Sequence, residues 1–108
     1  MERHGLVVNV VPGKRAEYLR LHSAVWPQVE QTLRDCNVTN YTIFIIEDTL
    51  FAYYEYVGDD LDADLSAMAA DPVVQQWWTL TDAMQDPYPE RDPGSWWMTL
   101  PEIFHTGD

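Results

Sequence analysis

The chain has few basic residues, one cysteine and no long apolar run, and each shortage excludes a class of protein. Six Lys and Arg stand against 18 Asp and Glu, so the formal charge is −12 over 108 residues. Such a charge repels phosphate backbones and anionic lipid surfaces, so we expect neither nucleic acid nor membrane among the partners. The aliphatic residues between positions 6 and 11 are too few for a signal-peptide core or a membrane span, and neither is expected.

Cysteine and histidine are also sparse, with one and three residues. Cys36 is the only cysteine, which excludes an intrachain disulfide and makes a reducing cytoplasm the expected compartment. We expect this thiol to pack in the interior. His4, His22 and His105 have no metal-ligand spacing, so no metal site is predicted. The acidic residues 59–64 do not form a calcium loop, because Leu65 stands where such a loop needs glycine; they are predicted to cap a helix N-terminus.

The chain is predicted to form a single domain over residues 1–108, because its length and its 46% apolar fraction suit one globular core. Patterning predicts strands, helices and turns in the order β-α-β-β-α-β. That order is typical of an α+β ferredoxin-like fold with an antiparallel sheet. The expected strands are 6–11, 40–46, 50–56 and 99–104; the expected helices are 14–23, 27–35, a segment after Gly58 that breaks at Pro72, and 73–84.

The strands carry apolar residues on both faces. Ile43 and Ile45 alternate with Phe44 and Ile46, whereas a half-exposed sheet should alternate apolar with polar residues. Two helical regions can cover one face only, so we expect the other face to pack on a second copy. The predicted assembly is a sheet-on-sheet homodimer, a dimeric α/β barrel. One face could instead form a ligand pocket, and both interpretations can hold together.

Two positions stand out as candidate site residues. His22 lies one helical turn after Tyr18, and an imidazole suits proton transfer near neutral pH. A histidine at such a position is, taken alone, more often a hydrogen-bonded helix residue. Trp77 falls on the apolar stripe of Val73, Leu80 and Met84.

The tryptophan pairs are ambiguous on periodicity alone. Trp78 is turned about 100° from Trp77 along a helix. The pair therefore either extends the core or forms a pocket wall. Trp96 and Trp97, in a Pro- and Gly-rich segment, are interpreted as a pocket lip, a dimer contact or both.

The spaced motifs resemble the L-rhamnose mutarotase family. Residues 18–30 are similar to its Y-x-x-x-H-x-x-x-W-P-x-x-E helix, and the resemblance covers nearly the whole chain. It does not include Trp96-Trp97, and His105 stands where an aromatic residue usually follows the Phe. The other matching motifs are Asn40-Tyr41, Gln76-Trp77-Trp78 and, in the expected last strand, Glu102-Ile103-Phe104.

The resemblance implies a cofactor-independent isomerase that interconverts the α and β anomers of L-rhamnose or a similar neutral deoxy-aldose. By matching motif, His22 is the acid/base residue, and Tyr18, Tyr41, Trp77 and Trp78 bind the sugar. It also implies a ferredoxin-like dimer. Two other functions stay open: a non-catalytic binding protein lined by aromatic residues, and a cofactor-free oxygenase of the same dimeric fold.

Overall fold

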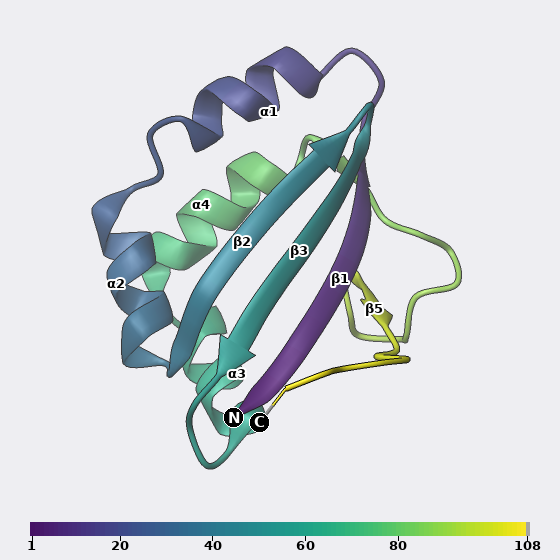
Figure 1. Cartoon of the computed structure of the whole chain (residues 1–108). Coiled ribbons are helices and arrows are strands. Elements are labelled where there is room, and N and C mark those ends of the chain that lie inside the picture. Colours follow the sequence, from purple (N-terminus) through teal and green to yellow (C-terminus); the bar gives the residue numbers. More distant parts are fainter. Residues whose placement is uncertain (108) are drawn as a thin grey trace.

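Helices and strands follow one another in the predicted β-α-β-β-α-β order, with each helical region split in two (Figure 1). The structure is a computed structural model, and it describes residues 1–107. The strands are β1 (Glu2–Val10), β2 (Val38–Ile46), β3 (Thr49–Tyr56), β4 (Gln85–Asp86) and β5 (Met98–Leu100); the helices are α1 (Arg15–His22), α2 (Pro27–Asp35), α3 (Leu61–Ala69) and α4 (Pro72–Asp82).

The strands form one antiparallel sheet in the order β2-β3-β1-β4, which confirms the ferredoxin-like α+β prediction. β5 also pairs with β1, along Gly5–Val7. The prediction of a last strand over 99–104 was wrong: β5 ends at Leu100, because Pro101 has no N–H to continue the ladder. Residues 102–104, assigned to that strand, lie beyond it.

Proline and aspartate determine where the later helices begin. Pro27 and Pro72 occupy the first turns of α2 and α4, where a missing N–H costs nothing. Asp60 caps α3 by accepting a hydrogen bond from the Ala63 N–H at 3.1 Å, which confirms the capping role predicted for the acidic run. Asp71 caps α4 in the same way, accepting from two backbone N–H groups at 2.9 and 3.1 Å.

The helices cover one face of the sheet, and the core lies between the two layers (Figure 1). Cys36 is buried there, as predicted. The buried stripe of α4 differs from the predicted one: it consists of Val74, Trp77 and Thr81, whereas Leu80 is 43% exposed. Thr81 can replace a leucine in the core because its hydroxyl donates to the Trp78 carbonyl at 3.2 Å.

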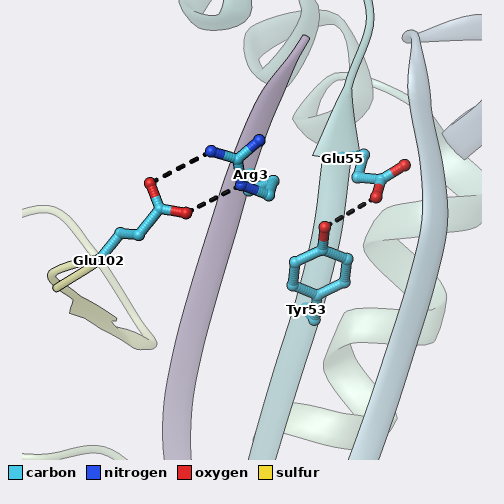
Figure 2. A network of polar contacts seen from close by, with 4 residues as sticks. All are labelled: Arg3, Tyr53, Glu55 and Glu102. Atoms are coloured by element: carbon cyan, nitrogen blue, oxygen red, sulfur yellow. Dashed lines mark hydrogen bonds and ion pairs between the residues drawn. The ribbon is translucent and has the colours of Figure 1, made fainter. Parts of the chain in front are cut away.

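The other face of the sheet carries no helix in the described chain and presents both apolar and charged side chains. Phe44 pairs across the strands with Phe51, and both are exposed, as is Ile46. Figure 2 shows Arg3 of β1 bound to Glu102 of the C-terminal segment, with an Nε to Oε1 distance of 2.8 Å. It also shows the Tyr53 hydroxyl donating to Glu55 at 2.7 Å on β3.

Within residues 1–107, every helix is too short or too polar to cross a membrane.

Candidate active site

His22 lies at the C-terminal end of α1 and stacks on Tyr18, one turn earlier, with ring centroids 4.3 Å apart. Its Nδ1 lies 3.1 Å from the Tyr18 carbonyl oxygen. A carbonyl can only accept, so Nδ1 carries the proton and Nε2 carries the lone pair of the neutral ring. Burial lowers the pKa of His22 below its usual range. The imidazole is therefore neutral at pH 7 and can accept a proton at Nε2.

Tyr18 is buried, and its hydroxyl oxygen accepts a hydrogen bond from Gln85 Nε2 at 2.8 Å. Burial raises the pKa of Tyr18 to about 12, and the carboxylate of Asp82 at the end of α4 adds to the increase. The phenol consequently keeps its proton at physiological pH. Its ring stacks on the imidazole, so a phenol that keeps its proton and a histidine that can accept one belong to the same cluster.

Trp77 and Trp26 complete an aromatic cluster around His22. The Trp77 ring meets the imidazole edge-on at 5.4 Å, and Trp26 meets Trp77 edge-on at 5.2 Å. Trp26 belongs to the W-P step of the motif, yet it was not predicted as a site residue. Trp78 is turned away from the core as expected: it is 37% exposed, against 5% for Trp77, and lies outside the ring stack on His22.

Tyr41 reaches the site from the start of β2, next to a β-bulge. Asn40 has φ 51°, and the register of β2 against β3 shifts between Thr39 and Thr42. This irregularity places Tyr41 parallel to Tyr54, with ring centroids 5.9 Å apart. Tyr41 is 39% exposed as a whole, yet burial raises the pKa of its phenol above the usual range, and nearby Tyr18 adds to the effect.

A small cavity of about 80 Å³ lies between α1 and β2, and both Tyr18 and His22 line it. A larger and more open groove of about 400 Å³ lies between α1 and α4, lined by charged residues such as Lys14, Glu17 and Arg20. None of the predicted site residues lines that groove. We place the candidate site at the smaller cavity, because it is lined by His22, the predicted acid/base residue, and by Tyr18, which stacks on it.

The structure thus brings together Tyr18, His22 and Trp77, sets Tyr41 near them, and leaves Trp78 at the surface. Sequence reasoning missed Gln85, since a lone glutamine before a proline-rich segment carries no motif signal. Among residues 1–107, no three His, Cys, Asp or Glu side chains converge as ligands for a metal ion.

The chain is thus a small ferredoxin-like α+β protein whose candidate site combines a histidine able to accept a proton at Nε2 with a cluster of aromatic rings. Comparison with known proteins identifies the family. The family model described as L-rhamnose mutarotase matches residues 3–106. L-rhamnose mutarotases of Phocaeicola vulgatus and Bacteroides thetaiotaomicron are 34% and 32% identical, over 97% of this chain and 98% of each relative.

Solved structures agree with the sequence comparison. The crystal structure of an L-rhamnose mutarotase from Formosa agariphila has a TM-score of 0.77 at 28% identity, covering 99% of this chain and 100% of that one. A tetracenomycin F2 cyclase from Streptomyces glaucescens shares the fold alone, with a TM-score of 0.63 at 16% identity. The chain belongs to the L-rhamnose mutarotase family, as its motifs predicted.

Proposed function

We propose that the protein is a cofactor-independent isomerase that interconverts the α and β anomers of L-rhamnose or another neutral deoxy-aldose. The observation that carries this proposal is the tautomer of His22, whose Nδ1 bond to a backbone carbonyl leaves Nε2 as a base. The family match over residues 3–106 supports the sugar as the substrate class.

Anomer exchange needs two proton transfers and no redox change. Nε2 of His22 takes the proton from the C1 hydroxyl while the ring oxygen receives one, so the bond between C1 and the ring oxygen breaks and C1 becomes a carbonyl. Rotation about the C1–C2 bond and the reverse transfers close the other anomer. The ring oxygen takes its proton from the neighbouring phenol of Tyr18 or from water. General acid–base catalysis of this kind contributes about 10²–10⁴-fold in rate.

The aromatic residues would hold the sugar. Tyr41 and Trp78 each keep part of a ring exposed, and a pyranose can rest an apolar face on such a ring. Trp77 is buried and contacts His22 edge-on. It would therefore form one wall of the site and orient the imidazole. The neutral substrate suffers no repulsion from the −12 charge.

The decisive test is saturation-transfer NMR on L-rhamnose and a panel of neutral aldoses, comparing His22→Asn with the wild type. Asparagine can hydrogen-bond a hydroxyl but cannot shuttle a proton, so exchange should fall at least about 100-fold while circular dichroism stays unchanged. His105→Asn is the matched control, because His105 is exposed in the segment beyond β5. Wild-type rates in a folded His22→Asn variant would end the assignment, and sugar binding without exchange would favour a binding protein.

We further propose that two copies pack through the uncovered face of the sheet. Phe44 and Ile46 are 61% and 63% exposed there, in a patch continuous with Phe51. A sheet face with such an exposed apolar patch can pack against the same patch of a second copy about a two-fold axis, which favours a second copy as the occupant. Sedimentation at micromolar concentration should give a dimer, and Phe44→Asp should give a folded monomer. A wild-type monomer would refute the assembly but leave the catalytic proposal standing.

Two further expectations accompany this function. We propose that residues 1–108 act as one mutarotase domain, since the family match spans nearly all of them. The expected compartment remains the cytoplasm, on the ground that the only cysteine, Cys36, is buried and unpaired with another thiol.

A further inference from the structure

Gln85, the first residue of β4, connects the proline-rich segment to the candidate site. Its side chain is 94% buried, and both ends of its carboxamide are hydrogen-bonded. Nε2 donates to the Tyr18 hydroxyl oxygen at 2.8 Å, and Oε1 accepts from the Trp96 indole Nε1 at 2.7 Å. A buried amide hydrogen-bonded at both ends, by side chains 67 and 11 positions away, is a positioned group.

Trp96 determines which way this amide faces. The indole N–H can only donate, so the amide atom beside it must be the oxygen. The NH₂ end must then face Tyr18, and the Tyr18 oxygen must accept. The hydroxyl proton of Tyr18 is therefore not directed to Gln85, and in the described chain its oxygen has no other hydrogen-bond partner than Gln85.

The segment that carries Trp96 is held in place by one arginine. Arg91 donates to the Ser95 carbonyl at 2.8 Å and to the Tyr88 carbonyl at 2.9 Å, and its guanidinium lies 5.9 Å from the centre of the Trp96 ring. The Tyr88 hydroxyl in turn donates to Asn9 of β1 at 3.1 Å. Trp96 itself is 39% exposed, and these contacts hold its loop so that the indole N–H reaches Gln85.

We propose that Trp96 and Gln85 are positioning residues that commit the Tyr18 hydroxyl to donate its proton to the bound sugar. The inference rests on the proposed function, since it assigns Tyr18 a sugar oxygen as its acceptor. It explains why a tryptophan outside the family motifs lies at this position: without its N–H, the amide can reverse and accept the Tyr18 proton itself. The Tyr18 hydroxyl would then donate its proton to Gln85 rather than to the sugar.

Two substitutions test the direction of the bonds. Gln85→Glu introduces an acceptor that competes for the Tyr18 proton, and we expect kcat/KM for anomer exchange to fall at least about tenfold. Trp96→Phe removes one donor and keeps the ring, so a loss of about fivefold is expected, as for one neutral hydrogen bond. Gln75→Glu is the matched control for Gln85→Glu: it makes the same chemical change at an exposed residue of α4, whose amide donates to the Ala69 carbonyl, and should leave exchange unchanged.

A double-mutant cycle separates this role from a merely structural one. If both residues act through the Tyr18 hydroxyl, neither Gln85→Glu nor Trp96→Phe should reduce exchange further in a Tyr18→Phe background. Losses that add to that of Tyr18→Phe would overturn the proposal. So would an indole N–H resonance of Trp96 that exchanges freely with solvent and does not move in Gln85→Glu. Absence of exchange in the wild type would instead overturn the proposed function, and this inference with it.

Discussion

Shortening Trp77 to alanine is expected to destabilise the fold severely, whereas the same change at Trp78 should mainly weaken sugar binding. Trp77 is 5% exposed, contacts the rings of His22 and Trp26, and lies in the buried stripe of α4. Trp78 is 37% exposed. The two residues are adjacent and chemically identical, so any difference between the variants comes from their surroundings.

The magnitude follows from the buried area. A buried aromatic side chain removes about 150–250 Å² from water, which corresponds to about 4–6 kcal/mol at roughly 25 cal/mol per Å². Because unfolded chains are themselves partly compact, the lower range of about 3–5 kcal/mol observed for core Trp to Ala changes is the better expectation. That is a large share of a typical unfolding free energy of about 5–15 kcal/mol. A drop in Tm of about 12–20 °C should accompany it, at about 4 °C per kcal/mol.

Urea unfolding followed by circular dichroism measures the difference without relying on tryptophan emission. Trp77→Phe is the intermediate control, since it keeps a ring at the centre of the cluster and should cost less than alanine. Trp78→Ala should lose less than about half as much unfolding free energy as Trp77→Ala, while sugar affinity falls. Equal losses at the two positions would refute the burial argument, and normal sugar binding in both variants would move the pocket elsewhere.

Three further outcomes are expected. Because burial lowers the pKa of His22, the midpoint of the decline in exchange on acidification should lie below the value of about 6.5 for a free imidazole, in a pH–rate profile that His22→Asn abolishes. Asp71→Ala removes the cap of α4 and should cost about 0.5–2 kcal/mol in urea unfolding. Gly58→Ala should lower Tm, because a Cβ there would lie 2.7 Å from Cζ of Tyr56; Gly5→Ala, with its nearest contact at 3.8 Å, should be tolerated.

Most of the fold could be predicted, because the residues that determine helix ends and turns act on the few residues next to them. Pro27 and the short turn after Ile46 set helix and hairpin boundaries that the structure reproduces closely. β4 was missed because two residues show no alternation, and its pairing depends on Val10, far away in the chain. The α4 stripe was misjudged because hydrophobicity ranks Leu80 above Thr81, whereas a hydrogen bond allows the threonine inside.

Only the part of the site that lies within one helix could be predicted from the sequence. Tyr18 and His22 share a face at helical spacing, so their contact follows from the sequence. The bond between Tyr18 and Gln85 joins residues 67 positions apart, and no periodicity encodes it. The orientation of that amide depends in turn on Trp96, whose environment only the folded chain creates.

β2 is an end strand of the sheet order, and this position affects how the protein behaves at high concentration. Its last four residues, 43–46, are all apolar, and an open strand edge of this kind is a template for pairing between molecules. At neutral pH the −12 charge keeps molecules apart at long range. Near the isoelectric point of about 4.3 that repulsion disappears, while the apolar edge remains. Acidic buffers should therefore promote precipitation through β2, and weakly basic solutions of modest ionic strength should keep the protein dispersed.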